Sequence, residues 1–76
     1  MKDMIDYVAK SLVDQAEKVE VRELADEQSG VLELKVAKED LGKVIGKQGR
    51  TIRAMRILLN AASSKHHKRM MLEIVE

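Results

Sequence analysis

The chain has 76 residues, a net charge of +1, no cysteine and a single aromatic residue, Tyr7. A chain of this length forms one domain with a small core, burying only about 60% of the surface that it exposes when unfolded, and without cysteine it can form neither a disulfide framework nor a thiolate metal site. No apolar run approaches the ~20 residues needed to cross a bilayer, and residues 1–18 mix acids and bases unlike a secretory signal, so we expect a soluble, cytoplasmic protein.

The N-terminal segment predicts an amphipathic helix of roughly 14 residues with Asp3 as its N-cap. Its apolar positions recur at helical spacing: Met4, Ile5, Val8, Leu12, Val13 and Ala16. Two half-buried strands follow, because apolar and charged residues then alternate around Val21 and again from Leu32 to Val36. Residues 26–30 between them predict a hairpin loop in which Gly30 takes a positive φ. Leu24 interrupts the alternation, which indicates that the first strand bulges or ends early.

Asp40 is expected to cap a single helical turn over residues 41–45, which Gly46 would end. A longer helix is predicted from about Arg50 to Ser64, then a polar connection over residues 65–68 and a last strand over residues 70–75. The order α-β-β-α-α-β implies an antiparallel hairpin and a right-handed crossover to a parallel third strand. We therefore predict an α+β fold in which three helices lie on one face of a three-stranded mixed sheet, with the whole chain, residues 1–76, forming one domain.

Charge is distributed unevenly along this order. Residues 1–40 carry a net charge of −5, whereas residues 41–72 contain eight basic residues and no acid. Such an asymmetry suggests an anionic partner for the second half, although a solvated basic helix would give the same pattern.

The loop Gly46-Lys47-Gln48-Gly49 lies inside the basic half, between two predicted helices. Its glycines would let a sugar-phosphate backbone approach the main chain, and its amides would lie at the positive end of the following helix dipole. Lys47 adds a charge and Gln48 a hydrogen-bonding group. The spacing fits neither a P-loop, which needs four residues between its glycines, nor a dinucleotide fingerprint, which needs glycine where Val44 stands.

The stretch from Val44 to Ile52 reads V-I-G-K-Q-G-R-T-I and resembles the core motif of KH domains, a GXXG loop flanked by isoleucines. The element order is similar to the type II, mostly bacterial, arrangement, and the resemblance covers essentially the whole chain, as in the small stand-alone KH proteins of bacteria. It implies a non-enzymatic protein that clamps single-stranded RNA at the loop and holds bases in an adjoining groove. The implied roles are a post-transcriptional regulator or an RNA chaperone.

By this resemblance the RNA site comprises residues of the loop and of the two helices beside it: Val44, Ile45, Gly46, Lys47, Gln48, Gly49, Arg50, Ile52 and Arg53. Residues 34–38 would form the far side of the groove. Ile45 and Ile52 have a second interpretation as core residues. Stacking on aromatic rings is excluded for bases in the groove, because Tyr7 lies on another helix, so one domain should bind weakly.

Weak binding by one domain favours an assembly with a second site. On the helix from Arg50, the stripe Ala54, Ile57 and Ala61 lies opposite the predicted core face and is our candidate dimer contact. The resemblance implies a homodimer, or a heterodimer with a larger KH protein of the Jag type. The alternative function is therefore a dimerisation adaptor that keeps the fold and binds a protein partner.

We expect no cofactor, no metal site and no membrane contact. His66 and His67 are adjacent on the chain with no nearby acid or cysteine, which favours a polar connection over metal ligation. No constellation of acids or nucleophiles indicates catalysis.

Overall fold

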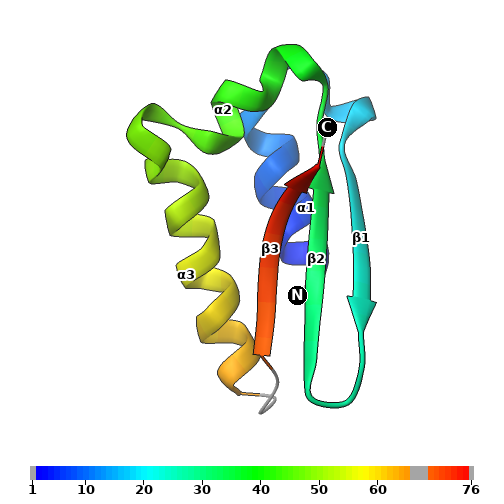
Figure 1. Ribbon diagram of the computed structural model, residues 1–76. Coiled ribbons are helices and arrows are strands. Elements are labelled where there is room, and N and C mark those ends of the chain that lie inside the picture. The colour runs from blue at the N-terminus through cyan, green and yellow to red at the C-terminus, as the bar shows by residue number, and fades with distance from the viewer. Residues whose placement is uncertain (1, 66–68, 76) are drawn as a thin grey trace.

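The computed structural model describes residues 2–65 and 69–75 and has the predicted order of elements (Figure 1). Six helices and strands make up the fold: α1 (Lys2–Leu12), β1 (Glu20–Ala25), β2 (Ser29–Lys35), α2 (Leu41–Ile45), α3 (Arg50–Ser64) and β3 (Arg69–Val75). Three 3-10 turns connect them: η1 (Ala16–Lys18), η2 (Lys38–Asp40) and η3 (Lys47–Gly49).

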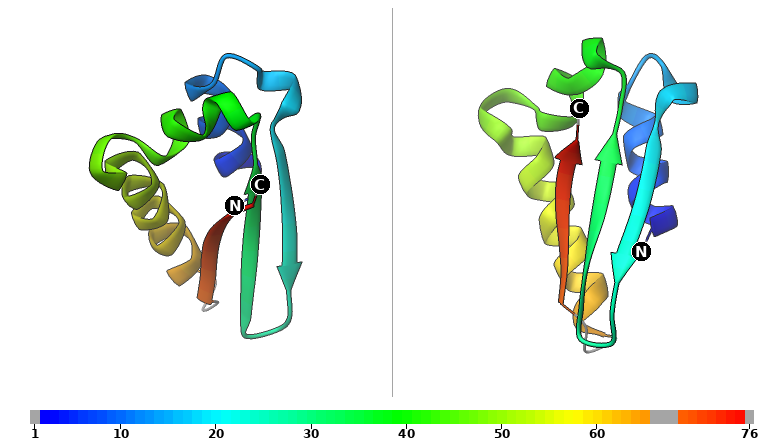
Figure 2. Two further views of the ribbon diagram at one scale, coloured as in Figure 1. Left: turned by 45° about the horizontal axis from the view of Figure 1, so that its top comes forward. Right: turned by 45° about the vertical axis from the view of Figure 1, so that its right-hand side comes forward.

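The sheet has the strand order β1-β2-β3, with β1 antiparallel and β3 parallel to the central strand. The helices α1 and α3 lie on one face of it, α1 against β1 and α3 against β3, while α2 lies at the end of the sheet where β2 and β3 finish (Figures 1 and 2). The predicted α+β class with a mixed sheet is confirmed. Within residues 2–65 and 69–75, the other face of the sheet carries no helix (Figure 2).

The core lies between the sheet and the helices. Side chains from every major element except β1 meet there with 3% exposure or less: Ile5, Ala9, Leu32, Leu34, Val44, Met55, Leu59, Met70 and Leu72. On α3, Ile52, Met55 and Leu59 are buried as the 3.6-residue period predicts. The same period predicts Ala62 as the next core position, but Ala62 is half-buried and Ser63 is buried instead.

The N-terminal helix is shorter than predicted. It ends at Leu12, and Ala16 belongs to the separate turn η1. Asp3 lies within the first turn of α1 rather than at its cap. The amide of Val13 still donates to the carbonyl of Ala9, and the chain then leaves the helix, because the amides of Asp14 and Gln15 donate to the carboxylate of Asp40 instead.

The hairpin also differs from the prediction in two respects. The register between β1 and β2 is unbroken from Glu20 to Ala25, so Leu24 is an ordinary strand residue that is 47% exposed on the uncovered face. Gly30 is a buried residue of β2 without a positive φ. A Cβ at Gly30 would lie 2.8 Å from the sulfur of Met70 and 2.9 Å from Cβ of Ala25, so glycine is required there by space rather than by backbone conformation.

Candidate nucleic-acid interface

The loop Gly46–Gly49 connects α2 to α3 and lies at the edge of the molecule (Figure 1). Gly46 ends α2, as predicted, with φ 79° and ψ 168°, a region that is essentially restricted to glycine. Gly49 is left-handed at φ 73°, and so is Gln48 at φ 57° and ψ 25°. A glutamine in this region is uncommon and carries a conformational cost, so the loop holds a strained residue at its tip.

The two glycines of the loop differ in the space around their Cα atoms. A Cβ at Gly46 would lie 2.2 Å from Oγ1 and 2.8 Å from the amide nitrogen of Thr51, so the space beside Gly46 is already filled by the first turn of α3. A Cβ at Gly49 would have its nearest neighbour 3.8 Å away, at Arg53. Only Gly49 therefore leaves the main chain open to a close approach from outside.

Several hydrogen bonds hold the loop in shape, among them one from the amide of Arg50 to the carbonyl of Lys47. The amide of Gly46 donates to the carbonyl of Gly42 at 2.8 Å, and the amide of Gly49 donates to the carbonyl of Gly46 at 3.0 Å. Nη2 of Arg53 donates to the carbonyl of Gln48 at 2.7 Å and so ties the strained tip to α3. Within the part of the chain that the structure describes, no acceptor is found for the amides of Lys47 and Gln48. These two donors are free to bind an anion in front of the N-terminus of a 15-residue helix.

The basic side chains of the predicted site surround this tip. Lys47, Gln48, Arg50 and Arg53 are exposed. Arg53 has a second role that the sequence did not indicate, because its guanidinium also holds the Gln48 carbonyl.

The apolar side chains of the predicted site divide between surface and core. Ile45 is 38% exposed beside the loop, whereas Ile52 is 7% exposed and Val44 has no exposed surface. Both buried residues belong to the core cluster, so Ile45 is the one exposed side chain among the three apolar residues of the predicted site. Val44 instead anchors α2, and thereby the start of the loop, in the core.

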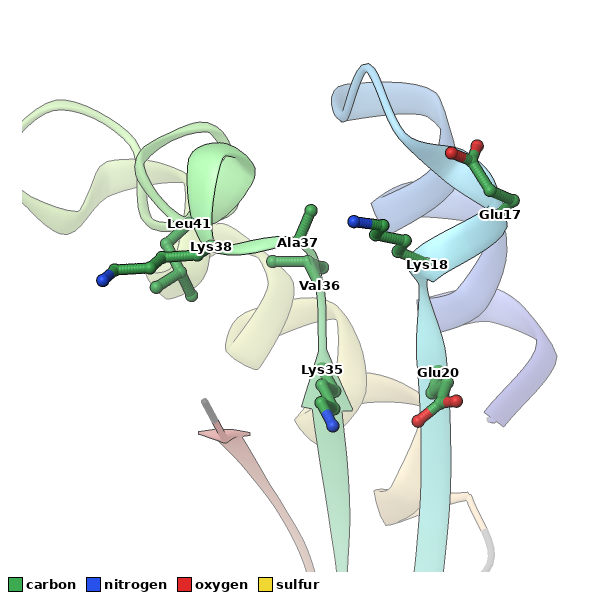
Figure 3. A pocket seen from close by; sticks show the side chains of 8 residues that line it. All are labelled: Glu17, Lys18, Glu20, Lys35, Val36, Ala37, Lys38 and Leu41. Carbon is green, nitrogen blue, oxygen red and sulfur yellow. The ribbon is translucent and has the colours of Figure 1, made fainter.

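The expected far side of the groove consists of alternately buried and exposed residues. Leu34, Val36 and Ala37 are buried, and Lys35 and Lys38 are exposed. Residues 35–38 line a cavity of about 550 Å³, together with residues of η1, β1 and α2: Glu17, Lys18, Glu20 and Leu41 (Figure 3). Its lining includes none of the four loop residues, so the structure does not join these two parts of the predicted groove into one cavity.

Asp40 lies directly before α2, at the other end of this short helix from the loop. It is 1% exposed, and its two carboxylate oxygens accept the amides of Asp14 and Gln15 at 3.3 and 3.0 Å. The predicted side-chain cap of α2 is absent, because the carboxylate faces these amides instead. Nζ of Lys43 pairs with Asp14 and lies 3.5 Å from Oδ1 of Asp40.

Burial acts to raise the pKa of Asp40, but the hydrogen bonds from Gln15 and Asp14 and the charge of Lys43 outweigh it and hold the pKa below its ordinary value. The hydrogen bond to Asp14 in turn raises the pKa of Lys43. A carboxyl group whose pKa is lowered on folding stabilises the fold above its ordinary pKa, and this contribution disappears as the pH falls through the lowered value.

The described residues contain no helix long and apolar enough to cross a membrane. They also contain no group of three His, Cys, Asp or Glu side chains that could hold a metal ion. His66 and His67 lie outside the described residues, so the prediction of a polar connection stays a prediction.

The model of the KH domain of KhpA and KhpB matches residues 2–74 of the sequence. The chain belongs to this family. No solved structure matches the chain.

The chain also matches relatives of similar length. The RNA-binding protein KhpA of Clostridium acetobutylicum is 53% identical over 75 residues, which cover 99% of this chain and all of that protein. The RNA-binding protein KhpA of Aquifex aeolicus is 50% identical, over the whole of this chain and 96% of its own length. That of Chlamydia pneumoniae is 46% identical, over the whole of this chain and 97% of its own length.

Proposed function

We propose that this KH domain binds single-stranded RNA by holding the sugar-phosphate backbone at the loop Gly46–Gly49. One observation carries the proposal: the free amides of Lys47 and Gln48 lie together at the tip of the loop, in front of the α3 N-terminus. Gly49 leaves room beside them, and the side chains of Lys47 and Arg50 add positive charge. Backbone amides with nearby cations suit phosphate oxygens. The relatives named as RNA-binding proteins support RNA as the polymer.

Bases would lie against Ile45, the exposed apolar side chain next to the loop. Tyr7, the sole aromatic residue, is 74% exposed on α1 and not part of this site. Without base stacking, the site discriminates weakly between sequences and binds each RNA segment modestly. This suits a cytoplasmic regulator or chaperone that contacts many RNAs, and it requires no catalytic step.

The salt dependence of RNA affinity tests the proposal. A KH loop contacts about four nucleotides, and each phosphate contacted on a single strand contributes about −0.7 to the slope of log K against log salt. We expect a slope of about −3 for a mixed-sequence RNA of eight nucleotides, measured by fluorescence anisotropy between 50 and 200 mM salt. A slope near zero, or the absence of binding at 50 mM salt, would contradict backbone binding and favour the protein adaptor.

The adaptor alternative, and a dimeric form of the RNA-binding protein, both depend on the outer side of α3. Ile57 is 67% exposed there between the exposed alanines 54 and 61, and the neighbouring Leu58 is 49% exposed. Small residues around one large apolar side chain let two helices approach closely, and burial of that side chain stabilises their contact by about 1.5–3 kcal/mol. We propose that this stripe pairs either with a second copy or with a larger KH protein of the Jag type.

At micromolar protein, Ile57→Asp should therefore lower the weight-average mass in sedimentation from that of a dimer to that of a monomer, because it buries an unpaired charge in the contact. Tyr7→Asp, which changes an exposed residue on α1, is the matched control and should leave the mass unchanged. Equal masses for the wild type and Ile57→Asp would exclude the helical contact.

A further inference from the structure

The uncovered face of the sheet carries an apolar row that crosses all three strands. Val31 of β2 is paired directly with Leu24 of β1 on one side and with Met71 of β3 on the other. Leu24 is 47% and Met71 56% exposed, and all three residues line a shallow cavity of about 310 Å³. In a sheet, paired residues point to the same face, so these side chains form one continuous strip.

Charged residues flank this strip along β3. Glu73 lies two residues after Met71 on this strand, and Arg69 lies two residues before it. Both are exposed. Residues two apart on a strand point to the same face, so both share the face of the apolar row and lie on opposite sides of it.

We propose that this sheet face binds the same face of a second copy of the chain, with the two-fold axis running along the apolar row. That axis places Leu24, Val31 and Met71 each opposite its own counterpart. It also places Glu73 of each copy opposite Arg69 of the other, so that the contact closes with two equivalent ion pairs. An isologous contact requires a surface that is complementary to itself, and this arrangement meets the requirement.

The charges on the central strand favour this axis over one along β2. An axis along β2 would place Glu33 opposite Glu33 and Lys35 opposite Lys35, both repulsive pairs, although it would also bring Arg22 of each copy opposite Glu73 of the other. Sheets that face each other pack about 10 Å apart, a separation that Arg69 and Glu73 are long enough to bridge. The strands contribute equal numbers of acidic and basic residues to this face: Glu20, Glu33, Glu73, Arg22, Lys35 and Arg69. RNA suits the face poorly, because its charge is balanced and its apolar row contains no aromatic side chain.

Three apolar side chains per copy form a small contact, so the sheet dimer is weaker than a permanent one. It is separate from the proposed pairing through α3, and two isologous faces on one chain would build assemblies larger than a dimer. The sheet contact is therefore tested in the Ile57→Asp chain, in which only the sheet face remains to associate.

Charge reversal on β3 is the test, with the dissociation constant measured by sedimentation equilibrium up to millimolar protein. In the Ile57→Asp chain we expect association that Glu73→Arg weakens at least tenfold, and Arg69→Glu likewise, because each places like charges opposite one another. The double variant Arg69→Glu/Glu73→Arg restores the pairs with reversed signs, so its dissociation constant should return to within about threefold of the parent. Both residues are exposed, so circular dichroism should show an unchanged fold in each variant.

Three outcomes would overturn the inference. They are an Ile57→Asp chain that stays monomeric throughout, single variants that associate as well as the parent, and a double variant that associates no better than the singles. A Leu24→Asp variant that loses RNA affinity but keeps its self-association would instead assign the face to RNA. The inference does not depend on RNA binding, so its failure leaves the proposed function intact.

Discussion

Replacing Gly46 with alanine is expected to lower the midpoint of thermal unfolding by roughly 10–20 °C and to weaken RNA binding. The new Cβ would lie 2.2–2.8 Å from three atoms of Thr51, one of them the backbone nitrogen. Backbone atoms of the first turn of α3 cannot move aside as the end of a flexible side chain can. The φ of 79° with ψ near 168° adds a further cost of about 1–3 kcal/mol for any residue with a Cβ. In a domain of this size each kcal/mol corresponds to about 4–8 °C.

Two other glycines provide matched controls measured by the same thermal unfolding. Gly49→Ala meets no atom closer than 3.8 Å and bears only the cost of a left-handed residue, about 1–2 kcal/mol. Gly42→Ala lies within α2 with no atom within 4 Å of its Cβ, so it should stabilise the protein by up to about 1 kcal/mol. The order of stability is then Gly42→Ala, wild type, Gly49→Ala, Gly46→Ala. Similar midpoints for the variants at positions 46 and 49 would contradict the steric account of the loop.

The fold was largely predictable because its signals are local and periodic. The alternation around Leu32 and Leu34 and the spacing of Ile52, Met55 and Leu59 each indicate one buried face, and the structure buries these residues. Because two helices connect β2 to β3, the chain can cross over the sheet, and a parallel pairing of these two strands is expected and found. Gly46 as a helix end follows from the same kind of local chemistry.

The predictions that were wrong concern features that depend on contacts between residues distant in the sequence. The end of α1 depends on hydrogen bonds to the carboxylate of Asp40, which lies 25 residues after Gln15 in the sequence. No sequence pattern near Leu12 indicates that the helix ends there. The place of Gly30 after a turn predicts a positive φ. Glycine is required at this position instead because a larger residue would clash with Met70 of the last strand.

The structure places the predicted loop residues at the surface and part of the predicted walls in the core, while their role in binding stays a prediction. Lys47, Gln48 and the arginines are exposed where the motif places them, but Val44 is buried because α2 is a short helix whose inner side meets the core. The left-handed Gln48 had no sequence signal, since glutamine has no preference for that region. The anchoring of its carbonyl by Arg53 depends on side-chain geometry that spacing alone does not fix.

Reversing the charge of the loop should have the largest effect on RNA. The double variant Lys47→Asp/Gln48→Asp removes one cation and adds two anions beside the free amides, so phosphate is repelled where it was held. We expect this variant to fold. Lys47 is exposed, and aspartate tolerates the left-handed conformation at position 48 better than glutamine does.

A control with the same change of net charge separates the loop from the overall charge of the protein. Lys2→Asp/Gln28→Asp alters two exposed residues, one in the first turn of α1 and one in the hairpin loop, where aspartate is favourable. It changes the charge of the whole molecule by the same amount and leaves the loop untouched.

The decisive measurement is the affinity of a mixed-sequence single-stranded RNA for three proteins at 100 mM salt: the wild type, the loop variant and this control, each shown by circular dichroism to be folded. We predict that the loop variant binds at least about 30-fold more weakly than the wild type, while the control stays within about fivefold of it, because only the loop contacts phosphate. Equal affinities of the loop variant and the wild type would place the RNA on another surface and contradict the proposed role of Gly46–Gly49.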